Sequence, residues 1–203
     1  MISLKSVPRT LAVVSAASVA LLTTLSMRTR GDDKDFRPIV EAEMPEGFPD
    51  YTGVGVVKVK EYPEYRRAVA ETGRSSAFWT LFSHIKKNKI AMTAPVEMSY
   101  DAEDPSDESM SFLYGSQAMG ETGRQGNVEV VDVTAMTVVS TGVRGPRRSK
   151  TVDEARARLA EWLIANKDRY VADGEYRVMG YNSPFVPRSK NYFEVEIPIR
   201  PVE

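Results

Sequence analysis

The segment KIAMTAPV, at residues 89–96, is the most informative part of this sequence. Its side chains alternate, and the alternation continues to residue 99, which predicts a strand over residues 90–99. Pro95 within it indicates an edge position or a bulge, because proline donates no ladder hydrogen bond. Just before it, residues 75–87 predict an amphipathic helix whose apolar positions recur at i, i+3, i+4 and i+7: Phe78, Leu81, Phe82 and Ile85.

The rest of the chain places further short strands around this helix and a second one. Turn signals and alternation predict strands at residues 54–59, 66–71, 110–114, 128–133, 136–142, 176–181 and 192–199. A second helix is expected over residues 151–170, with an apolar stripe of Val152, Ala155, Leu159, Trp162 and Leu163. The order β-β-α-β-β therefore occurs twice. We predict an α+β fold in which these duplicated units form a distorted antiparallel β-barrel or sheet flanked by two helices.

Composition limits the classes of function. The 203 residues are 42% hydrophobic and 27% charged, which is typical of one globular domain. No cysteine is present, which excludes disulfides, thiolate metal sites and thiol nucleophiles. The net charge is −1 and no basic stripe appears, so we expect no nucleic-acid partner, because phosphate contacts supply most of that affinity.

The N-terminus predicts a targeting segment. Lys5 and Arg9 precede the apolar run 11–25, which is shorter than the roughly 20 residues of a comfortable membrane span. We expect residues 1–31 to be a signal peptide or a membrane anchor, and the sequence leaves cleavage open. Residues 32–50 are rich in proline, glycine and acids and indicate a linker that settles onto the domain. The domain itself is expected at 51–203, exported or anchored at the cell envelope.

Residues that carry catalytic chemistry are sparse. His84 is the one histidine in the sequence, so a triad with a histidine base has no other candidate. It is either a partly exposed residue at the flank of the first helix or a single axial ligand to heme iron. The acidic run 101–108 lacks EF-hand spacing and indicates a solvated loop. We predict no catalytic residue and no metal site, and the chain is expected to be a binding protein rather than an enzyme.

Apolar and aromatic side chains are the remaining signal. They lie in or beside the predicted strands and on the first helix: Met92, Met98, Phe112, Tyr114, Tyr176, Tyr181, Tyr192, Phe78 and Phe82. Most such residues pack in a core. A minority can line a pocket for a flat apolar ligand, with arginine or lysine at its mouth for carboxylates.

Segment 89–96 also resembles the K-I-x-M-T-x-P-V segment of the SOUL heme-binding family. Three further pieces agree with that family in order and spacing: EYPEYRRAV at 61–69, TVVSTG at 137–142, and GYNSP at 180–184 followed by NYFEV at 191–195. Together they cover residues 51–199. The resemblance implies a distorted β-barrel flanked by two helices, and heme as the cofactor. Carried onto this sequence, the heme surface comprises Phe78, Leu81, Phe82, His84, Tyr181, Arg188 and Lys190.

Two functions follow as expectations. The first is a carrier or buffer for heme or another tetrapyrrole at the cell envelope. The alternative is an effector-binding module for another apolar or cationic small molecule, which a pocket lined by Glu97 or Glu194 would favour. A hydrolase is a third class, and two inward-facing acids with perturbed pKa values would be its signature. The sequence leaves the oligomeric state open.

Overall fold

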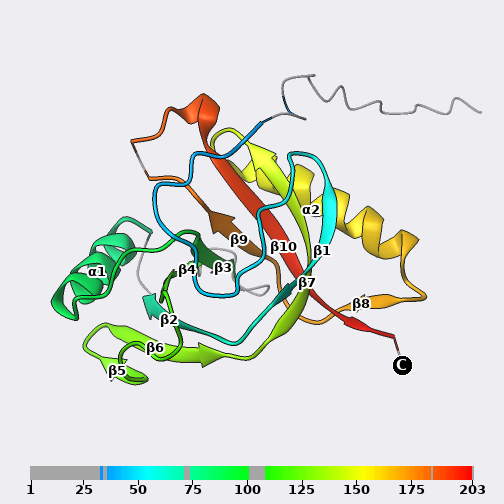
Figure 1. Ribbon diagram of the computed structural model, residues 1–203. Helices are drawn as coiled ribbons and strands as arrows, with labels where there is room; N and C mark the ends of the chain where they lie inside the picture. Colours follow the sequence, from blue (N-terminus) through cyan, green and yellow to red (C-terminus); the bar gives the residue numbers. More distant parts are fainter. Residues whose placement is uncertain (1–32, 34–35, 71–73, 101–107, 184, 203) are drawn as a thin grey trace, which may run out of the picture.

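The described chain is one antiparallel sheet with two α-helices (Figure 1). The computed structural model describes residues 33, 36–70, 74–100, 108–183 and 185–202. The helices are α1 (Arg74–Lys87) and α2 (Ser149–Ala165), and a short 3₁₀ turn, η2, spans Arg188–Lys190. The ten strands of these residues are β1 (Val57–Tyr62), β2 (Tyr65–Ala70), β3 (Val96–Tyr100), β4 (Glu108–Leu113), β5 (Gly123–Gln125), β6 (Val128–Val133), β7 (Met136–Arg144), β8 (Tyr170–Ala172), β9 (Arg177–Gly180) and β10 (Tyr192–Pro201).

The strand order confirms the duplication. The sheet runs β1-β7-β10-β9-β3-β4-β2-β6-β5, and β8 pairs with β10 outside this path. The two units are β1-β2-α1-β3-β4 and β6-β7-α2-β9-β10. Exchanging each strand with its counterpart in the other unit reverses the order from β1 to β6 and leaves every neighbour unchanged. The first strand of each unit pairs with the second strand of the other, β1 with β7 and β6 with β2, so neither unit forms its sheet alone. The strand path ends at β1 and β5, so the distorted barrel is not closed.

Two predicted elements extend about five residues beyond the observed ones. Residues 90–95 are not a strand, and β3 begins at Val96. Lys89 has a φ of 56° and Pro95 donates no hydrogen bond, so the backbone of this segment bonds elsewhere: the Ala94 amide donates to the Glu43 carbonyl at 3.0 Å. The second helix ends at Ala165 instead of residue 170, because the Asn166 side chain donates to the Trp162 carbonyl at 2.8 Å and β8 follows.

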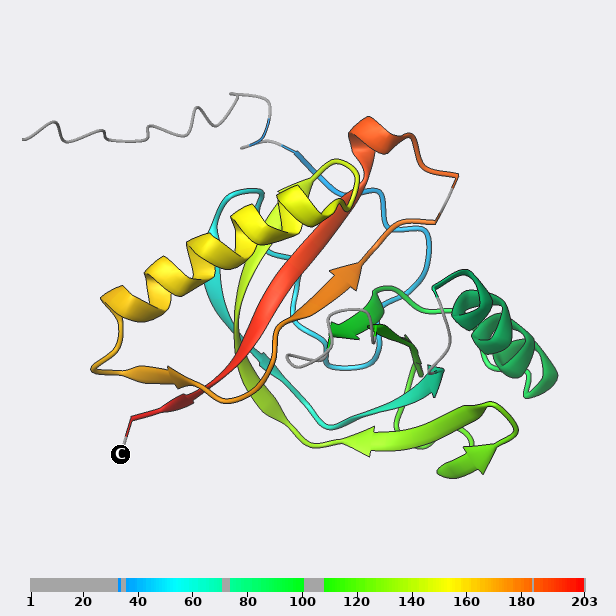
Figure 2. The ribbon, with the colours of Figure 1, turned by 180° about the vertical axis from the view of Figure 1, so that it is seen from behind.

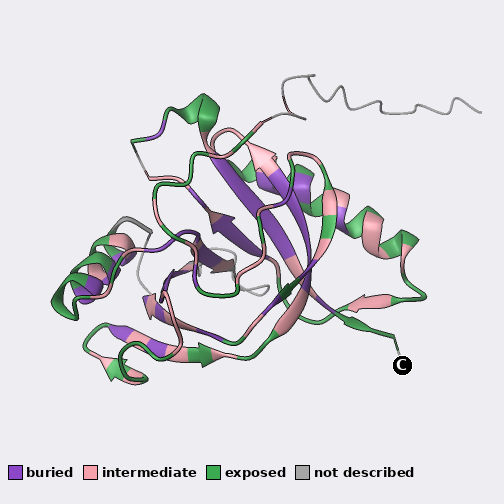
Figure 3. Cartoon of the chain, viewed as in Figure 1, coloured by how far each residue is buried: buried purple, intermediate pink, exposed green. Residues whose placement is uncertain are grey.

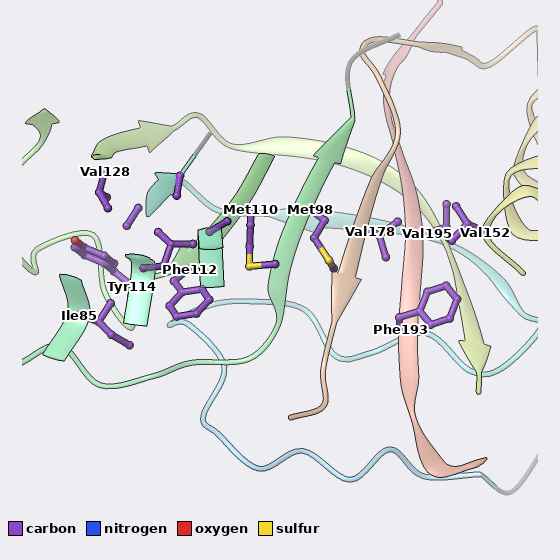
Figure 4. Packing of buried hydrophobic residues seen from close by; sticks show 14 of the residues in the cluster. Ile85, Met98, Met110, Phe112, Tyr114, Val128, Val152, Val178, Phe193 and Val195 are labelled. Carbon is purple, nitrogen blue, oxygen red and sulfur yellow. The ribbon is translucent and has the colours of Figure 1, made fainter. Parts of the chain in front are cut away.

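The pleat of the sheet separates apolar from charged side chains. On β10, Phe193, Val195 and Ile199 join the main hydrophobic cluster, while Tyr192, Glu194 and Glu196 point to the opposite face. Figure 4 follows the main cluster from Val128, Ile85 and Tyr114, near α1, through Met98 and Val178 to Phe193 and Val152, near α2. Helix α1 contributes Ala77, Leu81 and Ile85, and α2 contributes Val152, Ala155 and Leu159. The predicted apolar face of the second helix is thereby confirmed, and that of the first is confirmed except at Phe82, which is 38% exposed.

A long irregular segment covers the other face. Residues 36–56, here called the strap, cross the sheet on the side opposite α2 (Figures 1 and 2). Their apolar side chains pack in a second cluster with Tyr62, Val138, Met179, Tyr181 and Tyr192; the strap contributes Phe36, Met44, Phe48, Tyr51 and Val54. Figure 3 shows the central strands buried beneath these layers. The segment expected to settle onto the domain as a linker thus packs tightly against it.

No helix in the described part of the chain is long and apolar enough to cross a membrane. The predicted targeting segment, residues 1–31, lies outside the described residues.

Candidate functional site

One side of α1 exposes a row of aromatic rings, here called the aromatic flank: Phe78, Trp79 and Phe82. Phe78 packs edge-on against Phe112 of the core, with ring centroids 5.3 Å apart. Phe82 lies nearly parallel to Phe78 at 6.2 Å and 9°, and Trp79 meets both rings edge-on. Trp79 is 64% exposed and Phe82 is 38% exposed. Large aromatic side chains seldom stay in water without a partner, so this flank is a candidate ligand surface.

His84 lies behind the flank rather than on the surface. It is buried, and its Nε2 is 2.8 Å from the Tyr114 hydroxyl. Its Nδ1 is 3.3 Å from the side-chain nitrogen of Asn88. Burial, with a smaller contribution from Lys87, lowers the pKa of His84. Both ring nitrogens are therefore engaged within the fold, which differs from the partly exposed residue expected from the sequence.

The other predicted heme residues are divided between two parts of the molecule. Leu81 is fully buried in the main cluster, and Tyr181 is buried in the second cluster beside Tyr192. Arg188 and Lys190 are exposed on η2, within the connection between β9 and β10. The structure stacks Phe78 against Phe82 on α1, whereas Leu81 and Tyr181 are buried in two separate hydrophobic clusters.

A groove runs along the other side of α1. It has a volume of about 770 Å³ and lies between the helix and the β5–β6 turn. A smaller cleft of about 440 Å³ lies between the strap and the residues after β4, with Tyr65 and Tyr114 among its walls. Sequence reasoning missed the groove, because its second wall is forty residues away from the helix along the chain.

A set of charges that is fully buried except for the partly exposed Arg67 lies between the sheet and the strap. We call it the interior charge cluster: Lys60, Arg67, Glu97, Arg177, Glu194 and Glu196. Lys60 Nζ lies 2.7 Å from Glu194 Oε2 and 3.5 Å from Glu196 Oε1. Arg177 pairs with Glu196 at 2.9 Å and lies 3.6 Å from Glu97, which Arg67 also contacts. Three cations thus face three carboxylates.

Tyrosine hydroxyls and the strap complete this cluster. Tyr62 donates to Glu196 at 2.7 Å, and Tyr65 donates to Glu97 at 2.9 Å. The Thr52 amide of the strap donates to Glu194, and the single O–H of Tyr192 is shared between Glu194 and the Thr52 carbonyl. Buried charges are tolerated only when they are paired and hydrogen-bonded in this way.

The pKa values of the two acids of β10, Glu194 and Glu196, are shifted in opposite directions. Burial raises the pKa of Glu194, which Lys60 only partly offsets and Glu196 reinforces. Burial also acts on Glu196, but Arg177 and Lys60 together hold its pKa below the ordinary value. These are two inward-facing acids with perturbed pKa values, the signature expected of a hydrolase. Both side chains are completely buried, however, and the groove and the cleft are lined by other residues.

Glu97 and Glu194 were the acids that would favour a cationic ligand. In the structure each is neutralised by a cation of the same chain, Glu97 by Arg67 and Glu194 by Lys60. One sequence signal indicates this cluster: Glu194 and Glu196 alternate with apolar residues in a strand whose other positions are core. Lys60 and Arg177, their partners, were not singled out. Among the described residues no group of three or more acidic, histidine or cysteine side chains is arranged to hold a metal ion.

A comparison with models of known protein families assigns the chain to one of them. The family model of the SOUL heme-binding proteins matches residues 49–198. The chain belongs to the SOUL family. The match covers all strands and both helices except the end of β10, and it confirms the resemblance based on segment 89–96. The SOUL family is described by heme binding and not by a reaction. A search of curated protein sequences finds no significant match to this SOUL chain.

Solved structures share the fold at low sequence identity. The EcmrR C-terminal domain is 18% identical, with a TM-score of 0.54 over 72% of this chain and 98% of that domain. EcmrR in its DNA complex is 17% identical in sequence, with a TM-score of 0.56, and the match covers 72% of this chain and 58% of the EcmrR chain. A structure described as a hydrolase from Listeria innocua is 12% identical in sequence, with a TM-score of 0.55, and the match covers 74% of this chain and 94% of that one. At these identities the likeness shows that the SOUL domain and these proteins share a fold.

Proposed function

We propose that this SOUL chain binds heme or a related tetrapyrrole on the aromatic flank of α1 and acts as a carrier or buffer at the cell envelope. The observation that carries the proposal is the exposed aromatic row: Trp79 and Phe82 are in water while Phe78 beneath them is fixed to the core. A flat macrocycle can cover these rings and bury apolar area on both partners. Family membership supports the same ligand.

The residues present fit contact with the porphyrin ring better than ligation of its iron. His84 would have to leave both Tyr114 and Asn88 before it could reach an iron atom. Arg188 and Lys190 are exposed cations of the kind that pair with propionate groups. Bound heme would supply its iron for redox or gas-binding chemistry. The chain supplies an apolar platform and no ready axial imidazole.

Hemin titration of residues 32–203 tests the proposal, once this fragment is shown to unfold cooperatively. We expect a Soret shift that saturates at one hemin per chain. Phe82→Ala should weaken the affinity about tenfold, because loss of ring contact and apolar area costs on the order of 1.4 kcal/mol. Ile164→Ala is the matched control, since Ile164 is an exposed apolar residue of α2, and it should bind as the parent does. A parent without a saturable shift would contradict heme binding.

The Phe82 and Ile164 variants also separate specific from nonspecific binding. Equal weakening of both would mean that hemin adsorbs to any exposed apolar residue. The heme of His84→Ala should keep the parent's Soret position, because His84 is engaged with Tyr114. A changed spectrum would show that His84 ligates the iron.

The location at the envelope rests on the apolar run 11–25 and its basic flank. We propose that residues 1–31 direct export or hold the chain at a membrane, and that residues 51–203 form the heme-binding domain. Cell fractionation of the full chain and of residues 32–203 tests this. The full chain should be found in the envelope fraction and the shorter one in the soluble cytoplasmic fraction. Identical distributions would refute a targeting role for the segment.

The alternative, an effector module for cations, receives no support from the interior acids. Their charges are already balanced by Lys60, Arg67 and Arg177. A cation that entered this space would have to displace an internal one and leave it buried without a partner.

A further inference from the structure

The groove beside α1 has walls from two separate parts of the chain. One wall is a polar stripe of the helix, in which Ser76, Thr80, Ser83 and Lys87 recur at i, i+4, i+7 and i+11. The other is the β5–β6 turn, with Gln125, Gly126 and Asn127. Gly126 has a φ of 68°, which lets the chain reverse there and place Gln125 and Asn127 in the wall of the groove, where the Gln125 amide nitrogen donates to the Glu121 carbonyl at 2.9 Å. The groove is therefore bounded by a helix on one side and a hairpin turn on the other.

The chemistry of this groove differs from that of the aromatic flank. Six of its eleven lining residues carry a hydroxyl or a carboxamide: Ser76, Thr80, Ser83, Asn88, Gln125 and Asn127. None of the described residues that line it carries a carboxylate, and the charged group among them is Lys87, with the buried ring of His84 behind. Uncharged groups that both donate and accept hydrogen bonds match a ligand that carries many hydroxyls. They match a porphyrin poorly, since its surface is mostly apolar.

Trp79, a member of the aromatic flank, also lines this groove and stands between the polar stripe and the two phenylalanines. Its ring is 64% exposed and lines the groove. The face of an indole ring is negative, so it attracts the weakly positive C–H edges of a saturated ring that lies on it. An aromatic platform beside hydroxyl and amide groups is an arrangement that holds a sugar ring by one face and by its edge.

We infer that the groove between α1 and the β5–β6 turn binds a saccharide that carries a carboxylate, such as a uronic acid unit. The sugar ring stacks on Trp79, its hydroxyls bond to the hydroxyl and amide side chains, and its carboxylate pairs with Lys87. The absence of a lining carboxylate favours an anionic ligand over a cationic one. This site shares Trp79 with the proposed heme surface and differs from it in every other residue, because Phe78 and Phe82 do not line the groove.

The chain offers a clean optical probe for this site. It contains two tryptophans, and the second, Trp162, lies on α2 against Tyr170. Trp162→Phe therefore makes Trp79 the sole indole. In this background, trigalacturonate is titrated against the full chain, held in a detergent without a sugar headgroup, and maltotriose serves as the neutral comparison. We expect a saturating change in Trp79 fluorescence with a Kd on the order of 1 mM or tighter, as suits an open groove.

Two neighbouring lysines give the matched pair of variants. Lys87 lines the groove and Lys86 does not, although both are exposed in the last turn of α1. Lys87→Ala should weaken trigalacturonate binding about threefold, as expected for a surface ion pair, and should leave maltotriose binding unchanged. Lys86→Ala should leave both unchanged.

Three results would overturn the inference. They are no saturable signal with trigalacturonate up to about 10 mM, equal weakening by Lys86→Ala and Lys87→Ala, and tighter binding of maltotriose than of trigalacturonate. Hemin titration of the same variants keeps this proposal separate from the proposed function. Lys87→Ala should bind hemin as the parent does, so failure at one site leaves the other measurable.

Discussion

Lys60→Met should destabilise the SOUL domain by about 3–5 kcal/mol, measured as the free energy of unfolding in urea at pH 7.5. The lysine side chain is completely buried and contacts both Glu194 and Glu196. Methionine has a similar volume, so the packing is largely kept and the loss is electrostatic. Without the ammonium group, two cations remain for three buried carboxylates, and the extra negative charge has no solvent to stabilise it.

The loss should become smaller at lower pH. Burial already raises the pKa of Glu194 in the parent, and removal of Lys60 raises it further. The folded variant then keeps a proton on Glu194 at a pH where the unfolded chain has released it. The contribution of this proton to the stability of the variant is fully present below the pKa of Glu194 in the unfolded chain. It is lost as the pH rises through the higher pKa of Glu194 in the folded variant. Urea unfolding at pH 5.5 and pH 7.5 measures this difference.

Two control variants separate the effect of losing the Lys60 charge from other effects of the substitution. Lys58→Met changes the same residue type on the same face of β1, but at an exposed position, and should alter stability by less than about 0.5 kcal/mol. The double variant Lys60→Met/Glu194→Gln removes both charges and should recover most of the loss, because replacing both members of a buried pair is often close to neutral. A single variant as stable as the parent, or a double variant no better than the single one, would contradict this electrostatic account.

Gly142→Ala should detach the strap from the sheet and cost about 3 kcal/mol, at the upper end of the range for overpacking. A Cβ at this position would lie 2.4 Å from the Thr52 carbonyl oxygen and 2.8 Å from that of Gly53. These are backbone atoms and cannot rotate away, so the strap must move. Its movement breaks the bonds from the Thr52 amide to Glu194 and from Gly55 to the Gly142 carbonyl.

Limited proteolysis and urea unfolding measure the two parts of this effect. Cleavage within residues 36–56 should become faster in Gly142→Ala, in addition to the lower stability. Gly115→Ala is the matched control, because its Cβ would lie at ordinary distances of 3.6 Å from Met119 and 4.0 Å from Thr93. That variant should stay within about 1 kcal/mol of the parent. Unchanged cleavage of the strap in Gly142→Ala would show that these contacts do not hold it.

Local sequence patterns predicted most of the architecture. Val128–Val133 was located to the residue, and α1 and the start of β7 to within one, because each has a regular period and clear turn signals. The strand predicted over residues 90–99 was half wrong, since alternation continued through residues whose backbone is irregular at Lys89 and Pro95. Pattern alone does not distinguish a strand from an extended segment that bonds to a distant residue such as Glu43.

The candidate site was predicted less completely than the fold. Phe78 and Phe82 were identified as ligand residues and do stand on one exposed flank of α1, but Trp79, the most exposed of the three, was not singled out. His84 was expected at a helix flank, and its burial depends on Tyr114, thirty residues later in the chain. Sequence periodicity shows which face of a helix a residue occupies. It does not show what the rest of the chain places against that face.

The sequence by itself determined the SOUL membership, the duplicated β-β-α-β-β order and the apolar faces of both helices, because these depend on local periodicity and on one characteristic segment, residues 89–96. Only the tertiary structure decided that Lys60, Arg177 and the acids of β10 meet in a balanced interior cluster, and that the strap seals it. The physical reason is distance along the chain. The free energy of a buried charge depends on partners that the sheet order brings together from separate strands, and no local pattern encodes that order.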